Sequence, residues 1–241
     1  RQQLMKIALI GYGKMGKAIE RIAIERGHEI VARYNSDNPY TIDSKCNADV
    51  AIEFSRPDLV VEHIKTAVSN RLPLVVGTTA WSEYLNEIRV LIEEKHGSLV
   101  YASNFSIGVN IFEQLTERLA SLLSKHSQYK LSIDETHHLQ KLDAPSGTAV
   151  SLAEALLANH GGYSQWELTP VSNHDSLPIT AHRLPDVPGT HVIRATSPID
   201  TITLTHEAHN RDGFALGSIL AAEFLKGKNG LFTMKDVLNL N

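Results

Sequence analysis

The feature that most constrains the fold of this 241-residue chain is a glycine pattern, Gly11-x-Gly13-x-x-Gly16. It follows an apolar run of strand length, KIALI at 6–10, and precedes residues that are apolar at helical spacing. In such a turn the first glycine permits the sharp bend, the second lets the backbone approach a pyrophosphate, and the third lets the helix pack on the strand. The pattern therefore predicts a dinucleotide site. The alternative is that the glycines serve packing alone.

The alternation of strand and helix continues along the first hundred residues. The sequence predicts strands over 28–34, 48–54, 72–77 and 98–103, alternating with helices over 56–70 and 82–97. Alternation of this kind builds a Rossmann-type, doubly wound parallel sheet with helices on both faces. The first domain is accordingly predicted as α/β over 1–104.

The pattern changes after residue 104. We expect an amphipathic helix over 109–126 with Ile111, Leu115, Leu119 and Leu122 on one face, a strand over 129–138, a helix over about 145–160, and two strands in 189–208 joined by a Ser-Pro-Ile-Asp turn. Tight turns between strands favour a mixed or antiparallel sheet, so 105–211 is predicted as an α+β substrate domain. The tail, 212–241, is predicted to be helical and to belong to the first domain.

Composition narrows the class of partner. The formal net charge is −4, with Lys and Arg scattered along the chain, which does not favour nucleic acid or an anionic membrane. No apolar run approaches the roughly 20 residues of a membrane span. The single cysteine, Cys46, fits a reducing cytosol.

His206 and His209 stand three apart on a predicted strand and face opposite ways, so no metal site is predicted. We expect a cytoplasmic protein with a small-molecule partner. Residues 1–4 precede Met5, a plausible start, and are left out of the fold prediction.

The sequence leaves the cofactor preference open. An acidic residue near the end of the second strand would bind the adenosine ribose, but the region carries Arg33 and Asn35, with Asp37 two residues late. Arg33 can equally well meet the 2′-phosphate of NADPH. Loops at 77–79 and 102–105 also follow strands and are candidates for cofactor contact, the alternative being ordinary turns.

Two adjacent histidines provide the candidate for proton transfer. Histidine is the commonest side chain for this role near neutral pH, and on a strand His137 and His138 point to opposite faces. Lys141 follows where the strand ends, and its cation can bind a carboxylate. The alternative is that both histidines are ordinary strand residues.

The segment after the histidines predicts a helix entry. Asp143 or Ser146 is the expected cap, with Pro145 near the first turn. Gly147 and Thr148 would then offer backbone N–H groups to an anion such as a substrate carboxylate. The alternative is that the segment only caps the helix.

These residues resemble a known family. The motif E-x-H-H-x-x-K-x-D-A-P-S-G-T-A at 135–149 is similar to the signature of 4-hydroxy-tetrahydrodipicolinate reductase, also called dihydrodipicolinate reductase. The likeness extends over nearly the whole chain and includes the glycine loop, IEFSRP at 52–57, VVGTT at 75–79, ASNFSIGVN at 102–110, VPGTH at 187–191, HEAHNRDGFALG at 206–217 and GLFTMKDVL at 230–238. It implies reduction of a cyclic imine dicarboxylate by NADH or NADPH, on the diaminopimelate route to lysine, in a homotetramer built through the substrate-domain sheet.

The resemblance also implies residue roles. His137 is the implied proton donor or acceptor, Lys141 the second catalytic residue, and His138, Gly147 and Thr148 bind substrate carboxylates. The implied cofactor contacts are Gly11, Tyr12, Gly13, Lys14, Met15, Gly16, Gly77, Thr78, Thr79, Ala102, Ser103, Asn104 and Phe105, with Arg33 and Asn35 as further candidates. Two departures concern the cofactor: 35–48 is shorter than is usual in the family, and the acid after the second strand is replaced. Two other classes stay open: a related dehydrogenase of another small acid, and a dinucleotide sensor without chemistry.

Overall fold

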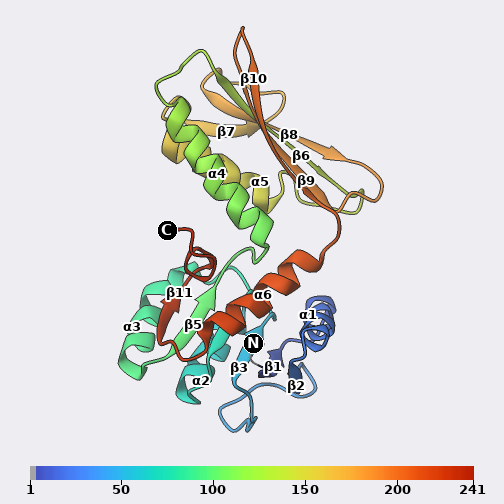
Figure 1. Ribbon diagram of the computed structural model, residues 1–241, viewed down its shortest axis with the longest axis vertical. Helices are drawn as coiled ribbons and strands as arrows, with labels where there is room; N and C mark the ends of the chain where they lie inside the picture. Colours follow the sequence, from blue (N-terminus) through green and yellow to red (C-terminus); the bar gives the residue numbers. More distant parts are fainter. Residues whose placement is uncertain (1–3) are drawn as a thin grey trace. The chain divides into compact units, whose positions relative to one another are not determined.

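The structure, a computed structural model, describes residues 4–241. The chain divides into two units, one comprising the residues up to Ile107 with Asp212–Asn241, the other Gly108–Arg211. Each has its own sheet (Figure 1).

The first unit is built on a parallel sheet of six strands in the order β11-β5-β4-β3-β1-β2. The strands are β1 (Lys6–Ile10), β2 (Glu29–Tyr34), β3 (Val50–Glu53), β4 (Leu74–Val76), β5 (Ser98–Tyr101) and β11 (Gly230–Phe232). The helices are α1 (Lys14–Glu25), α2 (Val60–Ser69), α3 (Leu85–Lys95), α6 (Asp212–Leu225) and α7 (Met234–Val237), with a 3-10 turn at η1 (Ser82–Tyr84).

The two faces of this sheet have separate cores. Ile7 and Leu9 of β1 pack with α1 and α6, whereas Ala8 and Ile10 pack with α2 and α3. Successive side chains of a strand point to opposite faces, so a strand covered on both sides must be apolar throughout. This explains the run KIALI and confirms the predicted doubly wound sheet.

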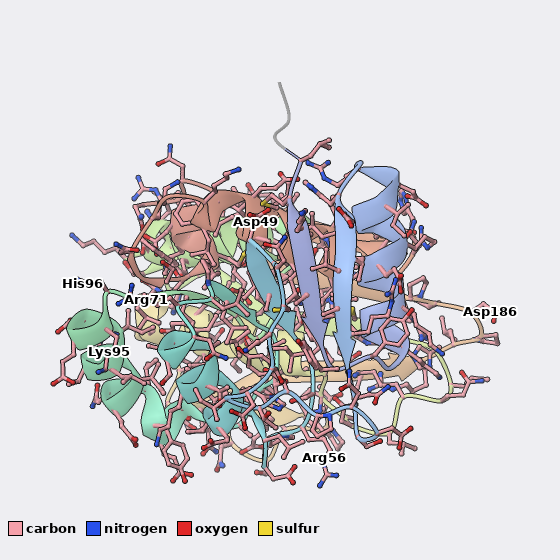
Figure 2. The ribbon with its side chains drawn as sticks, turned by 90° about the horizontal axis from the view of Figure 1, so that it is seen from below. Asp49, Arg56, Arg71, Lys95, His96 and Asp186 are labelled. Carbon is pink, nitrogen blue, oxygen red and sulfur yellow. The ribbon has the colours of Figure 1, made fainter. Side chains whose placement is uncertain are left out.

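The sheet has a topological switch point between β1 and β3. The chain runs from β1 to β2 on one side and then returns to β3 on the other side of β1. In sheets of this kind ligands bind beyond the carboxyl ends of the strands at the switch point. The opposite edge carries Arg71 and His96, which follow α2 and α3 with left-handed backbone (φ 54° and 52°) and are labelled together in Figure 2.

The second unit contains a mixed sheet in the order β10-β9-β6-β8-β7. Its elements are α4 (Ile107–Leu123), β6 (Lys130–His137), α5 (Gly147–His160), β7 (Gln165–Leu168), β8 (Ser176–Arg183), β9 (Gly189–Thr196) and β10 (Thr201–Ala208). Strand β6 pairs parallel with β8 and antiparallel with β9, and β9 and β10 form the predicted hairpin. The prediction of a mixed sheet is confirmed.

Helix α4 does not bury the face that the sequence suggests. Leu119 is buried, but Ile111, Leu115 and Leu122 are 42%, 51% and 55% exposed. The buried stripe instead includes Thr116 and other small or aromatic residues. The helix carries apolar residues on more than one face, so its period alone does not identify the buried one.

Three strands were not predicted. Strand β7 has four residues and partly exposed side chains, β8 contains Pro178, and β11 has three residues within a tail predicted to be helical. Strands of three or four residues show too little periodicity to be recognised, and a proline within a run argues against a strand. Strand β11 pairs with β5 and completes the first sheet.

Candidate active site

The glycine loop follows β1 and begins α1. At Gly11, φ is +98° and an added Cβ would lie 1.8 Å from the Phe54 carbonyl oxygen. At Gly16 it would lie 2.7 Å from the Gly11 oxygen. At Gly13 it would meet nothing within 4 Å. Packing within the protein therefore explains the first and third glycines, whereas the second faces open space that a ligand can approach.

The amino end of α1 is suited to an anion. Gly13 is its N-cap and supplies no side chain to the free N–H groups, and the first turn contains no acidic residue. Lys14 is in that turn. An unsatisfied helix terminus with this charge favours a phosphate. The loop therefore fits the pyrophosphate of a dinucleotide.

A cavity of about 370 Å³ lies beside this loop at the switch point. Its walls are Gly13, Lys14, Met15, Gly16, Phe54, Ser55, Pro57, Gly77, Thr78 and Thr79. The loops after β1, β3 and β4 thus meet, and the predicted residues of the first two cofactor loops largely line one cavity. Glu53, fully buried, accepts hydrogen bonds from Thr78 Oγ1 (3.0 Å) and Ser55 Oγ and ties two of these loops together.

In the third predicted cofactor loop, at 102–105, some side chains pack or form hydrogen bonds within the protein. Ala102, Ser103 and Asn104 follow β5, and Asn104 Oδ1 accepts from the Ser106 N–H (2.8 Å). Phe105 is fully buried, and its ring contacts Phe54 and Phe214. The side chain of Phe105 therefore belongs to the core, and only its backbone is available to a ligand.

Arg33 and Asn35 both have partners within the protein. Glu20 accepts hydrogen bonds from Arg33 and from the Tyr12 hydroxyl, and the Arg33 guanidinium lies 5.8 Å from the Tyr12 ring centroid. Asn35 Oδ1 accepts from the N–H groups of Asp37 and Asn38, both at 2.9 Å. Asn35 thus shapes a turn, while Arg33 is held by Glu20.

In the second unit, His137 ends β6 and belongs to a buried polar network. It is 9% exposed, and its Nδ1 lies 2.5 Å from Glu135 Oε2. Arg183 donates to both oxygens of Glu135, at 2.9 and 3.0 Å. Burial raises the pKa of Glu135, but hydrogen bonds from His137, Arg183 and the Ser146 N–H outweigh it and hold the pKa at about 2. Glu135 is therefore ionised at neutral pH.

The amino end of α5 joins the same network. Ser146 is its N-cap, and Ser146 Oγ accepts from the Ala149 N–H (3.1 Å) and pairs with His191 Nε2 (2.9 Å). Burial lowers the pKa of His191 to about 4, with a further contribution from His137, so His191 is neutral at pH 7. Gly147 begins the helix, and an added Cβ there would meet nothing within 4 Å. Thr148 follows in the first turn, where N–H groups are available to an anion.

The structure decides between the two expected caps. Ser146 is the cap, and Pro145 directly precedes it, close to the first turn of the helix. Asp143 instead forms an ion pair with Lys141 Nζ at 2.9 Å, and this hydrogen bond lowers the pKa of Asp143. His138 Nδ1 is buried without a hydrogen-bond partner.

Sequence reasoning missed three members of the network, Glu135, Arg183 and His191. Arg183 lies on β8 in register with His137, and His191 lies on β9 in register with Glu135. Glu135 stands in the recognised motif, so its position was visible although its role was not. Arg183 and His191 become neighbours of Glu135 only through strand pairing; His191 ends the recognised motif VPGTH, whereas no local pattern marks Arg183.

Within residues 4–241, three or more His, Cys, Asp or Glu side chains are nowhere grouped in a way that could hold a metal ion. Over the same range, every helix is too short or too polar to span a membrane.

A doubly wound sheet with this glycine loop, joined to a unit with a buried histidine–carboxylate pair, defines the chain as a dinucleotide-dependent oxidoreductase. Comparison with known proteins identifies it further. Residues 5–105 match the family model "Dihydrodipicolinate reductase, N-terminus", and 108–238 match "Dihydrodipicolinate reductase, C-terminus". The chain belongs to the dihydrodipicolinate reductase family.

Individual relatives agree over their whole length. A 4-hydroxy-tetrahydrodipicolinate reductase of Christiangramia forsetii is 44% identical over 98% of both chains, and one of Staphylococcus haemolyticus is 36% identical over 97% of this chain and all of the relative. A dipicolinate-bound dihydrodipicolinate reductase from a Paenisporosarcina species superimposes with a TM-score of 0.76 at 25% identity, covering 96% of this chain and 98% of that one. A scyllo-inositol dehydrogenase from Lactobacillus casei (TM-score 0.56, 10% identity, 98% and 93% covered) shares the fold alone.

Proposed function

We propose that this protein reduces 4-hydroxy-tetrahydrodipicolinate (dihydrodipicolinate) to tetrahydrodipicolinate with NADH or NADPH, in the diaminopimelate route to lysine. The observation that carries the proposal is the fold of the 135–149 motif. It combines a buried histidine, suited to proton transfer, with a helix terminus suited to a carboxylate, and one buried carboxylate, that of Glu135, binds both. This combination suits an anionic substrate that must receive a proton.

The first unit is proposed to bind the cofactor. Gly11 to Gly16, Gly77 to Thr79 and the backbone of Ala102 to Phe105 would bind the dinucleotide, with Arg33 close to its adenosine end. A bound nicotinamide would supply the hydride. The cavity at the switch point and the open face of Gly13 support this assignment.

The second unit is proposed to bind the substrate. His137 transfers the proton, and Lys141 is the second catalytic residue. His138, Gly147 and Thr148 bind the carboxylates through an imidazole and two backbone N–H groups. Replacing Lys141 by Ala should raise KM and lower kcat, because the cation acts on the bound substrate and on the reacting centre.

We further propose that the protein is cytoplasmic and forms a homotetramer through the mixed sheet of the second unit. The exposed side chains along β10, among them Ile202 (39% exposed), support an interface on that sheet. Light scattering of the purified protein would measure the mass of the assembly, and a monomer would contradict this assignment.

The function is tested by mixing the protein with substrate generated from pyruvate and aspartate semialdehyde by the preceding aldolase. Loss of NADH and of NADPH absorbance is followed in parallel. Rapid oxidation that requires the condensation product supports the proposal, and the ratio of the two rates gives the cofactor preference. Oxidation with other small keto or amino acids, and none with the imine, would assign a different dehydrogenase. Cofactor binding without any turnover would favour a sensor.

A further inference from the structure

We propose that Glu135 is a positioning residue for His137, fixing the ring so that Nε2 is the nitrogen that exchanges a proton with substrate. Arg183 holds Glu135 in place, and Gly189 leaves room for the ring on its other side. The inference rests on the proposed function, since it concerns the proton step of that reaction.

Both oxygens of the Glu135 carboxylate are fully used as hydrogen-bond acceptors. Oε2 accepts from His137 Nδ1 (2.5 Å) and Arg183 Nη1 (2.9 Å), and Oε1 accepts from the Ser146 N–H (3.0 Å) and Arg183 Nη2 (3.0 Å). The Glu135 side chain is fully buried. A buried carboxylate that accepts four hydrogen bonds, two of them from one arginine, has one orientation available to it.

The contact with Glu135 also determines which ring nitrogen of His137 carries a hydrogen. An ionised carboxylate only accepts hydrogen bonds, so the short contact with Glu135 requires Nδ1 to carry a hydrogen. In the neutral ring Nε2 is then the free base, and in the imidazolium Nε2–H is the acid. After the 4-hydroxyl group of the substrate has left as water, the Nε2–H bond breaks, a C–H bond forms on the substrate carbon, and the ring becomes neutral with its remaining hydrogen on Nδ1. A bound nicotinamide would supply the hydride, which balances the reduction.

The space beside Nε2 of His137 is limited by the backbone of Gly189. Gly189 begins β9, and an added Cβ there would lie 3.0 Å from His137 Nε2 and 3.3 Å from its Cδ2. Alanine at this position would press on the ring. The ring of His191 lies 5.1 Å away in an edge-on arrangement and is neutral, so it adds no competing charge. Glu135 and Gly189 thus bound the ring of His137 from two sides.

Arg183 also connects Glu135 to the segment before α5, which is proposed to bind the substrate. Besides Glu135, its Nη2 donates to the Asp143 carbonyl oxygen (2.7 Å). Glu135 itself holds the Ser146 N–H directly before Gly147. A purely structural role of the network would therefore disturb substrate binding as much as turnover, whereas a positioning role acts mainly on turnover.

The test compares Glu135→Gln with Glu167→Gln, His137→Gln and the Glu135→Gln/His137→Gln double variant. Glu167 is a matched control because it is a carboxylate of the same unit with several hydrogen bonds, on β7 and outside the network. We expect Glu135→Gln to lower kcat at least 100-fold and to change KM less than fivefold. In the His137→Gln background the same substitution should change kcat less than threefold, because a residue that acts through His137 has nothing left to act on. The control should leave kcat unchanged.

A loss of kcat in the His137→Gln background equal to that in the wild type would overturn the proposal. If Glu135→Gln does not fold, as judged by circular dichroism, Gly189→Ala replaces it. That variant leaves the charges intact and should lower kcat at least fivefold at constant KM, and an unchanged kcat would contradict the role.

A second readout does not depend on turnover. In protein labelled with ¹⁵N-histidine, the short bond to Glu135 should give a downfield proton signal on Nδ1 that His137→Gln removes. Its absence from the wild type would also overturn the proposal. If the wild type shows the signal but does not oxidise either cofactor with the imine, the proposed function fails while the geometry of His137 stands.

Discussion

The two candidate sites are held in place by different means. The cofactor loop is fixed by backbone conformation and close packing, at Gly11 and Gly16, and needs no charged side chain. The His137 network is fixed by the ion pair between Glu135 on β6 and Arg183 on β8, with the neutral His191 on the neighbouring strand β9. A backbone-defined site tolerates changes of side chain but no added atoms, whereas a charge-defined site tolerates neither the loss of a partner nor a change in its protonation. The predictions below test this contrast.

The largest effect is expected at His137. Replacing it by Gln removes the imidazole, keeps the approximate size of the side chain, and should lower kcat about 10²–10⁴-fold with little change in KM. A proton donor acts in the transition state more than in the ground state, so in the proposed mechanism the affinity for substrate would be spared. Steady-state kinetics with the imine substrate measures both constants. A variant with wild-type kcat would remove His137 from the mechanism.

The glycine loop provides the next largest effect, and a matched pair of variants. Gly11→Ala forces a methyl group against the Phe54 carbonyl at a positive φ and should cost at least about 2 kcal/mol of unfolding free energy. Gly13→Ala meets nothing within the protein, has φ −86°, and should cost less than about 1 kcal/mol. We expect Gly13→Ala to weaken cofactor binding at least tenfold all the same.

Urea unfolding and cofactor titration of both variants separate the two effects. If Gly13→Ala binds the cofactor as the wild type does, then the open face of this glycine is not where the pyrophosphate approaches.

The same contrast explains how much of the molecule was predictable from its sequence. The glycine loop depends on six consecutive residues, so its conformation, its β-α-β setting and the N-terminus of α1 follow from local pattern. The network around His137 depends on Arg183, which lies 48 residues from Glu135 and on a strand that was not predicted. The choice between Asp143 and Ser146 as cap is settled by where α5 begins, at Gly147 directly after Ser146. Local sequence patterns therefore predict backbone conformation well, but they do not predict which side chains strand pairing brings together.

A smaller effect is expected at Arg33, where the candidate cofactor site of the first unit does contain a charged side chain. Arg33 is a charged side chain in the cofactor region, and Glu20 holds its guanidinium. The carboxylate of Glu20 would repel the 2′-phosphate of NADPH, so Glu20→Gln should raise kcat/KM for NADPH relative to NADH. For an ion pair that is 42% exposed on the Arg33 side, about 1 kcal/mol, or roughly fivefold, is reasonable.

Kinetics with both cofactors measure the ratio of the two constants. Arg33→Ala serves as the opposite variant and should lower the same ratio. An unchanged ratio in both variants would exclude Arg33 from the adenosine site.

A further prediction concerns the acid sensitivity of the charge-defined unit. The pKa of His191 is about 4 in the folded protein, mainly through burial, against about 6.5 in the unfolded chain. Between these values the unfolded chain binds a proton that the folded protein does not, so the free energy of unfolding falls as the pH falls, by up to about 1.4 kcal/mol per pH unit. His191→Gln removes this contribution while an amide can still bond Ser146. The variant should therefore show a shallower pH dependence between pH 6.5 and 4.5, whatever its stability at pH 7.

Tryptophan fluorescence can assign this effect to the second unit. Trp166 packs against the core of that unit and Trp81 lies in the first, so a Trp81→Phe background leaves Trp166 as the reporter. Urea unfolding at pH 6.5, 5.5 and 4.5 with and without His191→Gln gives the two slopes. Equal slopes would mean that burial of His191 does not link folding to protonation, and the acid sensitivity would then rest on Glu135, whose pKa of about 2 confines its contribution to lower pH. That carboxylate stabilises the fold above its unfolded pKa, and the stabilisation is lost as the pH falls from about 4.5 towards 2.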